Sequence, residues 1–536
     1  MSYVDALFDR EKDRIHVVER VDGKREYREY PATYCFYYAD PRGKYKSIYG
    51  NPVSRFSTRN NKEFRKELRM QSGKLIFESD INPVFRCFEE NYKDDIAPKL
   101  QTAFFDIETD FDPVRGYSSP ADPFNAITAI SVYLQWMDQL ITLVLPPKTL
   151  TWETAQEVCN KFENTMLFDR EEDLLKTFLD LIDDADVLSG WNSEGYDIPY
   201  TVNRVKKLLS KDDTRRFCLW GQLPKKRMFE RFGAENQTYD LIGRVHMDYM
   251  QLYRKYTYEE RHSYSLDAIG EHELDEKKTA YEGTLDQLYN QNFETFIEYS
   301  RQDTALLDKL DKKLRFLALA NELAHANTVL LQTTMGAVAV TEQAIINEAH
   351  EQGLVVPNRR ERLTDEDTQA AGAYVAYPKK GMHEWVGAID INSLYPSAIR
   401  ALNMAGETIV GQLRPVMTDN YIKNKINNKS SFAMAWEGLF GTLEYTAVMK
   451  QSIGTEITVD WENGSESVHS AAEIWKLIFD SNQPWMLSAN GTIFTYEKEG
   501  VVPGLLKRWY SERQEIQAKL KQATDPDERE FLDKRQ

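Results

Sequence analysis

The chain has 536 residues, and its 67 lysines and arginines against 85 aspartates and glutamates leave a net charge of −18. This charge argues against a protein that binds nucleic acid through an overall basic coat. Acids clustered at metals and bases lining a groove would still allow a nucleic-acid enzyme. The length exceeds what one core serves, so about three or four domains are expected.

The four cysteines are far apart and show neither a Cys-x-x-Cys pair nor zinc-like spacing with histidine; they are Cys35, Cys87, Cys159 and Cys218. They indicate buried structural thiols in a reduced compartment. The N-terminus lacks a basic-then-apolar signal, and no apolar stretch reaches about 18 residues. We therefore expect a cytoplasmic protein that is not inserted in a membrane.

The first part of the chain predicts strands before helices. Residues 1–100 alternate aromatic and β-branched runs with turn signals, which predicts a β-rich domain. Residues 101–320 alternate apolar strands with helical patterns such as Glu171 to Leu181, which predicts a mixed α/β domain. A long helical stretch is then expected from Leu319 to about Glu351.

The last part of the chain predicts a second α/β region. A polar segment, 358–370, is expected to act as a connector. A strand from Trp385 to Ile391 should run into a turn at Leu394, and Leu505 to Leu520 has helical periodicity with basic residues on its polar side.

Acidic residues stand where predicted strands end. Asp106 and Glu108 follow the apolar run 103–105, and residues two apart on a strand share a face, so they could hold a divalent metal. A solvated strand end is the alternative. Asp197 follows a strand and a turn that can direct its carboxylate to a sheet edge. Its alternative is a helix-capping Asp before Pro199.

Tyr299 and Asp303 are four residues apart and fall on one helical face, unless they are only a surface pair. Gathered at the edge of one sheet from three elements, these four carboxylates would repel each other unless cations lay between them. Two ions about 3.5–4 Å apart would supply that balance, one activating water and the other stabilising the leaving oxygen of a phosphodiester. Oxygen ligands without His or Cys favour Mg²⁺ or Mn²⁺ over zinc.

Three strings resemble, in order, the three exonuclease motifs of family B DNA polymerases: Asp106-Ile-Glu-Thr, Gly190-Trp-Asn-x-x-x-Tyr-Asp-Ile-Pro-Tyr and Tyr299-x-x-x-Asp. The resemblance implies a 3′–5′ proofreading exonuclease with a ribonuclease-H-like fold, in which Tyr299 positions the attacking water. Its implied metal-binding carboxylates are Asp106, Glu108, Asp197 and Asp303. Tyr196 stands where family members often carry Phe, and Arg231 to Val245 resembles the family's strand-separating hairpin.

A second site is implied by Asp390-Ile-Asn-Ser-Leu-Tyr-Pro-Ser, which resembles motif A of the same family. Asp390 would bind both metals of nucleotidyl transfer, and the backbone around Leu394 would seat the triphosphate. Tyr395 would lie beneath the deoxyribose and exclude a 2′-hydroxyl. A buried structural Tyr is the alternative.

Two further strings extend the resemblance. Arg513 resembles the fingers Arg that grips the incoming triphosphate, although Gln517 stands where a Lys partner is expected, and a solvated helix face is the alternative. Gly372-Ala-Tyr-Val resembles the motif that links the exonuclease and polymerase modules and touches the template.

The resemblance divides the chain into five expected segments. They are an N-terminal β-rich domain (1–100), a 3′–5′ exonuclease domain (101–320), a helix and connector returning to the N-terminal domain (321–369), a partial palm with an insertion (370–498) and the start of the fingers helices (499–536).

The later family motifs, such as Tyr-Gly-Asp-Thr-Asp, do not occur in this sequence. The motifs that are present most resemble those of replicative polymerases of large tailed phages. We expect a fragment or split half of a DNA-directed DNA polymerase that alone degrades single-stranded DNA but does not extend primers. A stand-alone 3′–5′ exonuclease and a non-catalytic DNA-binding subunit are the alternatives.

The partners implied by the resemblance are a DNA primer-template, a single-stranded 3′ end and, if the polymerase is completed, deoxynucleoside triphosphates. A second polypeptide with the remaining motifs and a sliding clamp are also expected, with no membrane partner and, for a viral protein, a location in the host cytoplasm. DNA contact should be confined to basic tracts such as Pro224-Lys-Lys-Arg, which a solvated charge cluster explains equally well.

Overall fold

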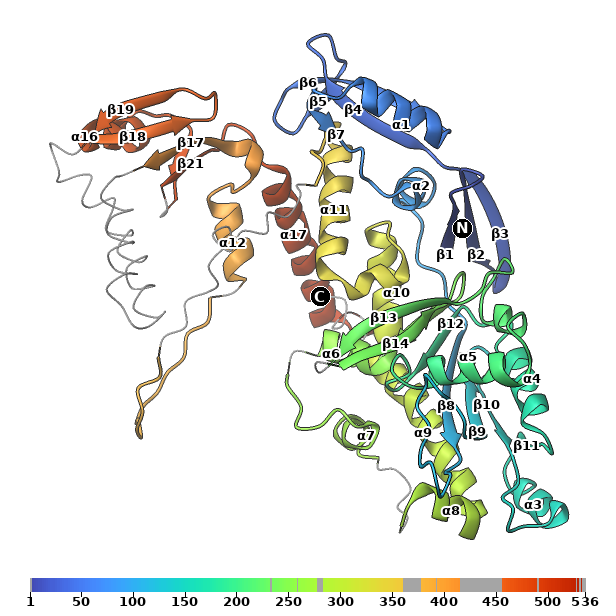
Figure 1. The fold of residues 1–536 in the computed structure, drawn as a ribbon. Helices are drawn as coiled ribbons and strands as arrows, with labels where there is room; N and C mark the ends of the chain where they lie inside the picture. Colours follow the sequence, from blue (N-terminus) through green and yellow to red (C-terminus); the bar gives the residue numbers. More distant parts are fainter. Residues whose placement is uncertain are drawn as a thin grey trace. The chain divides into compact units, whose positions relative to one another are not determined.

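The computed structural model describes residues 2–231, 234–257, 259–276, 283–359, 377–391, 393–414, 456–488, 491–526, 528–529 and 532. The chain forms two compact units (Figure 1). The first comprises Met1–Cys35, Ser57–Met70 and Ile81–Ala344, and the second comprises Phe36–Phe56, Gln71–Asp80 and Ile345–Gln536. Both units contain strands and helices, which confirms the mixed α/β class.

The first unit begins with a three-stranded antiparallel sheet, as the β-rich sequence predicts. Its strands, in spatial order, are β1 (Tyr3–Asp9), β2 (Arg14–Val21) and β3 (Lys24–Pro31). Helix α2 (Pro83–Tyr92) starts with Pro at its first position, and the Asn82 side chain accepts the Val84 N–H. Phe88 of this helix stacks on Tyr3, with ring centroids 3.8 Å apart, which joins the helix to the sheet.

A six-stranded mixed sheet forms the centre of the first unit, in the order β11-β10-β9-β8-β12-β15. Its strands are β8 (Thr102–Thr109), β9 (Ile127–Leu134), β10 (Gln139–Val144), β11 (Thr165–Leu167), β12 (Val187–Gly190) and β15 (Val245–Asp248). Strand β8 is antiparallel to β9 but parallel to β12, which is in turn parallel to β15. The carboxyl ends of β8, β12 and β15 therefore meet at one edge of the sheet.

Helices cover both faces of this sheet, and the alternation of side chains along β8 shows how. Phe105 and Ile107 enter a core that they share with two helices, whereas Phe104 enters the core on the opposite face with a third. These helices are α4 (Glu171–Leu181) and α5 (Asp197–Leu208) on the first face, and α9 (Phe293–Leu314) on the second (Figure 1). Buried Arg204 of α5 pairs with Glu171 of α4, which fixes the two helices together.

The first unit contains several further elements. They are α1 (Asn61–Met70), α3 (Trp152–Cys159), η1 (Asp213–Phe217), β13 (Lys225–Arg231), β14 (Ala234–Asp240), α6 (Tyr249–Tyr256), α7 (Leu266–Leu274), α8 (Leu285–Gln291), α10 (Phe316–Ala326), η2 (Leu331–Met335) and α11 (Ala337–Glu351), whose last residues belong to the second unit.

Two predicted elements of this region have different bounds in the structure. The single helix expected from Leu319 to Glu351 is wrong: α10 ends at Ala326, and α11 starts only at Ala337. The left-handed backbone of Thr328, with φ of 52°, breaks the helical path. The hairpin expected from Arg231 to Val245 instead pairs Lys225 with Asp240, so that Arg231 lies near its tip and not at its start.

The second unit contains two sheets. The strands of one, in the order β16-β5-β6-β4-β7, are β4 (Tyr34–Ala39), β5 (Tyr45–Ser47), β6 (Pro52–Thr58), β7 (Ile76–Phe77) and β16 (Leu354–Val355); β4 starts, and β6 ends, in the first unit. The other is antiparallel, in the order β19-β18-β17-β21-β20, with strands β17 (Ile409–Arg414), β18 (Glu456–Trp461), β19 (Glu466–Ser470), β20 (Trp485–Leu487) and β21 (Thr492–Thr495).

The helices of the second unit include one long element that the sequence predicts. They are α12 (Leu394–Ala401), η4 (Gly406–Thr408), α16 (Ala471–Trp475), η6 (Lys476–Asp480) and α17 (Val501–Gln522), in addition to the end of α11. Helix α17 contains the whole of the predicted helix from Leu505 to Leu520. Its Arg508 forms ion pairs with Glu348 and Glu351 of α11, at 2.7 and 3.0 Å.

The strand predicted from Trp385 to Ile391 is wrong, because these residues are irregular in the structure. Trp385 is 99% exposed and Ile389 98% exposed. A β-branched, apolar segment becomes a strand only where a neighbouring strand pairs with its backbone groups, and none of the described strands does so here.

The prediction of buried thiols is confirmed, since all four cysteines are buried. Among the described residues, no helix has the length and apolar character needed to cross a membrane.

Candidate metal centre

Two carboxylates project from the end of β8 toward helix α9. Phe104 of this strand belongs to the same buried core as Leu306 and Leu310 of α9, and side chains along a strand alternate between the two faces of the sheet. Asp106 and Glu108 therefore lie on the same side of the sheet as Phe104. Glu108 is only 7% exposed, so its charge has little access to water.

Helix α9 supplies a third carboxylate, Asp303, which is 3% exposed. It lies one turn before Leu306 and Leu307, on the helix face that packs against the sheet. The Ser300 hydroxyl, 2.8 Å from the Ser131 hydroxyl, ties this helix to β9. Because Ser131 is the register partner of Asp106, the helix is anchored at the level of the β8 carboxylates.

The three carboxylates Asp106, Glu108 and Asp303 converge, with one oxygen from each lying within 4.8 Å of the others. Among the described residues, this is the one group of three or more His, Cys, Asp or Glu side chains close enough to hold a metal. Like charges at this separation, largely removed from water, are unfavourable without a cation. A donor set made only of carboxylate oxygens suits a hard divalent cation, so the residues present fit such a metal.

Asp197, the first residue of α5, hydrogen-bonds to the same strand. The ladder between β12 and β8 ends at the pair Ser189 and Phe104, which leaves the Ile107 N–H free of β12. The Asp197 carboxylate accepts this N–H at 3.2 Å. Ile107 lies between Asp106 and Glu108, so Asp197 is adjacent to the acidic group, although it is not one of the three converging residues.

The buried environment of Asp197 explains the raised pKa of its carboxyl. Burial raises the pKa of this carboxyl from 3.8 to about 7, against the lowering effect of backbone hydrogen bonds, and the Asp248 carboxylate raises it further. The alternative of a simple helix cap does not describe the residue, because it is the first residue of α5 and bonds to a strand N–H. A nearby cation would favour its charged form.

Asp248 is a positioning residue that the sequence reasoning missed. Its two carboxylate oxygens accept the N–H groups of Asn192 and Glu194, each at 3.1 Å, and so fix the turn before Asp197. It also caps α6 by accepting the Met250 N–H at 3.0 Å. The sequence signal that could have identified Asp248 is its position directly between an apolar strand and a helical pattern. Burial raises the pKa of Asp248 to about 6.

The turn that carries Asp197 needs glycine at its start. A Cβ on Gly190 would lie 2.7 Å from the Phe105 carbonyl oxygen and 2.9 Å from the Ser193 Cβ.

The same turn contacts a buried histidine. The Ser193 hydroxyl is 2.9 Å from Nε2 of His246, whose pKa is lowered to about 3, first by burial and then by Arg227. His246 is therefore neutral near pH 7.

Two tyrosines lie close to the acidic residues. Tyr299 precedes Asp303 by one turn of α9, and its partly buried ring packs against the core that contains Phe296. The Tyr196 hydroxyl is 3.1 Å from the Thr109 hydroxyl. Burial raises the pKa of Tyr196, as do the carboxylates of Asp197, Glu108 and Asp106, so this phenol is within reach of their charges.

The residues predicted for nucleotide transfer lie in the second unit. Asp390 is exposed in the irregular segment before α12, and among the described residues it joins no group of metal-ligating side chains. Leu394 begins α12, and Tyr395 is 66% exposed, so the alternative of a buried structural Tyr is wrong. Arg513 is exposed on α17. The string at Gly372 lies outside the described residues.

Comparison with known protein families identifies two matches along this chain. Residues 53–269 match the family model for the exonuclease domain of DNA polymerase family B, and residues 328–536 match the model for DNA polymerase family B. The chain belongs to DNA polymerase family B. The exonuclease match of this family B chain contains Asp106, Glu108 and Asp197, whereas Asp303 lies between the two matched ranges.

Curated relatives include polymerases of phages and animals. The chain is 27% identical over 402 residues to the DNA-directed DNA polymerase of Escherichia phage RB69, which covers 71% of this family B chain and 44% of the relative. It is 29% identical to the DNA-directed DNA polymerase of Enterobacteria phage T4, covering 50% of the chain and 30% of the relative. The DNA polymerase delta catalytic subunit of Bos taurus is 29% identical, covering 51% and 26%. The matches thus span less than half the length of these relatives.

Proposed function

We propose that this chain is the exonuclease-bearing part of a DNA-directed DNA polymerase and that its acidic centre removes nucleotides from the 3′ end of a DNA strand. The observation that carries the proposal is the convergence of Asp106, Glu108 and Asp303 within 4.8 Å. Family membership supports the exonuclease assignment, because one of the two matched models is the exonuclease domain. The central mixed sheet with helices on both faces supports a ribonuclease-H-like fold for this domain.

The three converging carboxylates would hold Mg²⁺ or Mn²⁺, with Asp197 completing a set for two ions. When bound, such ions activate a water molecule and stabilise the leaving oxygen of a phosphodiester. Removing Asp197 from water makes its charged form unfavourable, so this residue favours a positive charge beside it. The family resemblance gives Tyr299, one turn from Asp303, the role of orienting the attacking water.

Protein groups that do not contact the substrate also have a role in this proposal. Asp248 holds the backbone of the turn before Asp197 through Asn192 and Glu194. Ser300 and Ser131 set the depth of α9 against β9. Rigid positioning of this kind matters, because displacement of a catalytic group by about 1 Å is enough to cost about 100-fold in rate.

The second unit would contribute the start of the polymerase site. In this proposal Asp390 is a metal ligand for nucleotidyl transfer, Leu394 and Tyr395 contact the incoming deoxynucleotide, and Arg513 binds its triphosphate. The match of residues 328–536 to the polymerase model supports this assignment. The substrates would be a DNA primer-template and deoxynucleoside triphosphates, and a sliding clamp and a second polypeptide would be partners of the complete enzyme. The five expected segments remain the proposed domain boundaries.

The nuclease proposal is tested with the purified chain and a 5′-labelled single-stranded oligonucleotide. With Mg²⁺ we expect a ladder of products shortened from the 3′ end, and with chelator we expect none. The variant Asp106→Ala with Glu108→Ala should lose this cleavage.

A matched control removes two carboxylates from a surface helix. Glu153 and Glu157 of α3 are exposed, and replacing both by alanine makes the same change in charge. This control should cleave like the unmodified chain. Equal cleavage by the control and the Asp106 and Glu108 variant would contradict the proposal and would favour a DNA-binding subunit without catalysis.

A further inference from the structure

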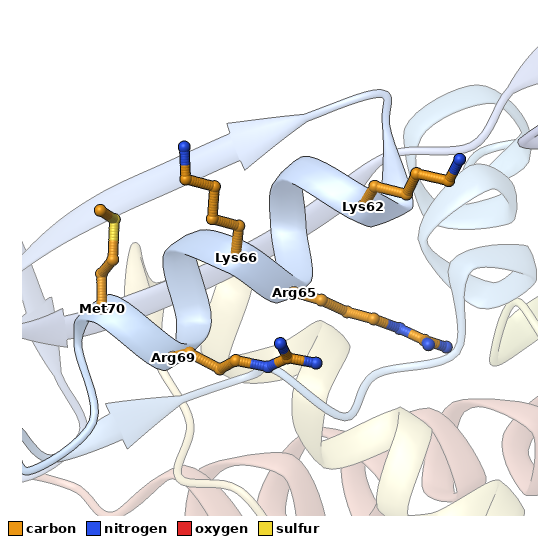
Figure 2. A pocket seen from close by; sticks show the side chains of 5 residues that line it. All are labelled: Lys62, Arg65, Lys66, Arg69 and Met70. Atoms are coloured by element: carbon orange, nitrogen blue, oxygen red, sulfur yellow. The ribbon is translucent and has the colours of Figure 1, made fainter.

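Basic side chains line the exposed surface of helix α1 in the first unit. Lys62, Arg65, Lys66 and Arg69 recur at helical spacing, all four are exposed, and Met70 ends the row. Figure 2 shows Lys62, Lys66 and Met70 projecting from one side of the helix and Arg65 and Arg69 from the adjoining side. The five side chains line a hollow with a volume of about 560 Å³.

These cations are not neutralised within the part of the chain that the structure describes. None of the four forms an ion pair with a described carboxylate. The two acidic residues of the helix do not change this: Glu63 accepts the hydroxyl of Thr58, and Glu67 has a separate interaction. In a chain with a net charge of −18, four unpaired positive charges on one helix indicate an external anion.

The chemistry of the surface narrows the class of that anion. The apolar side of the helix is already used, because Phe64 is buried, so the helix has no free apolar face to insert into a lipid surface. The exposed row offers four charges and a single apolar side chain, Met70, and not the charge-depleted core that a protein–protein interface buries, which argues against a folded protein partner. With a rise of about 1.5 Å per residue, Lys62 to Arg69 spans about 10 Å, comparable to about three phosphate spacings, and so to about four phosphates, of a helical strand.

We propose that the basic face of α1 binds the phosphodiester backbone of a nucleic-acid strand. This inference rests on the proposed function, because it gives the nuclease a second contact with its strand besides the acidic centre. Arginine forks and lysine ammonium groups both contact phosphate oxygens, and such contacts position a strand without reading its sequence.

The test measures binding without cleavage. The full chain with Asp106→Ala and Glu108→Ala is kept in chelator, and its affinity for labelled oligothymidylate and oligouridylate of about 20 nucleotides is measured from about 50 to 200 mM salt. Replacing the four basic residues of α1 by glutamine should reduce the slope of log affinity against log salt by about 2.8, because each of the four lost phosphate contacts contributes about 0.7. The salt-dependent loss of affinity over this range should then shrink by about 50-fold.

Two controls make the result specific. Lys24, Lys148, Lys206 and Lys211 are exposed lysines elsewhere in the first unit, and changing all four to glutamine alters the net charge equally. Exchange of lysine for arginine, and of arginine for lysine, at the four positions of α1 keeps the charge and should keep the slope.

The outcomes separate the proposal from its alternatives. A reduced slope for both oligonucleotides assigns the contact to the shared backbone, and a reduced slope for oligothymidylate alone assigns the strand as DNA. An unchanged slope in the α1 variant, or an equal reduction in the control with four changed lysines, would overturn the inference. Because the acidic centre is disabled throughout, failure of the nuclease proposal does not alter this reading.

Discussion

Replacing Asp197 by Asn should stabilise the metal-free protein at high pH while abolishing metal-dependent cleavage. The Asp197 carboxyl has a pKa of about 7 in the folded chain against 3.8 without burial. The folded state therefore binds this proton more tightly than the unfolded state, and stability falls as pH rises from about 4 to 7. Above pH 7 the stability contributed by the protonated carboxyl is fully lost.

The size of the effect follows from the pKa difference. About three pKa units correspond to about 4 kcal/mol at pH 8, and we take about 2–4 kcal/mol because an Asn side chain adds an amide N–H that needs an acceptor. For a domain of 150–250 residues, about 1 kcal/mol shifts Tm by about 2–4 °C. Asp197→Asn should therefore raise Tm by at least about 4 °C at pH 8 in chelator, and little at pH 4.

The assay is thermal unfolding of both proteins between pH 4 and pH 8, with chelator and with Mg²⁺. Mg²⁺ should raise the Tm of the unmodified chain at pH 8 more than that of the variant. Asp212→Asn is the matched control, since the side chain of Asp212 is 83% exposed, and its effect should stay within about 0.5 kcal/mol. Identical pH dependence of Tm in chelator for the unmodified chain and for Asp197→Asn would refute the reasoning.

Three further predictions concern single features of the chain. Gly190→Ala should destabilise the protein by about 1–3 kcal/mol in denaturant unfolding, because the new Cβ would lie 2.7 Å from the Phe105 carbonyl oxygen; unchanged stability would show that the turn yields easily. Tyr196→Phe should cost about 1 kcal/mol through loss of the Thr109 contact yet keep Mg²⁺-dependent cleavage, and loss of cleavage would make the phenol a catalytic group. The 536-residue polypeptide alone should not extend a primer, since Asp390 is exposed and joins no described acidic group; extension by the pure chain would contradict this.

Local patterns predicted much of the first unit because the relevant physics is local. The alternation along β8 places Asp106 and Glu108 on one face, and the helical period of α9 places Asp303 on the face that packs against the sheet. The helix from Glu171 to Leu181 has the predicted bounds, because apolar spacing and an acidic first turn act within the helix itself.

Features that depend on distant partners were not predictable from the sequence. The segment Trp385 to Ile391 has a strand-like composition, but no described strand pairs with it. Asp248 reads as an ordinary helix cap, and its role with Asn192 and Glu194 depends on β15 lying beside β12. The break at Thr328 is a single backbone conformation that apolar periodicity does not reveal.

The most direct test of the acidic centre is a crystal structure of the chain soaked with Mn²⁺, with anomalous scattering used to locate the ions. The account predicts Mn²⁺ bound by the oxygens of Asp106, Glu108 and Asp303, with loss of this density in the Asp106→Ala and Glu108→Ala variant. Absence of Mn²⁺ from these carboxylates at saturating concentration, while the protein remains folded, would contradict it.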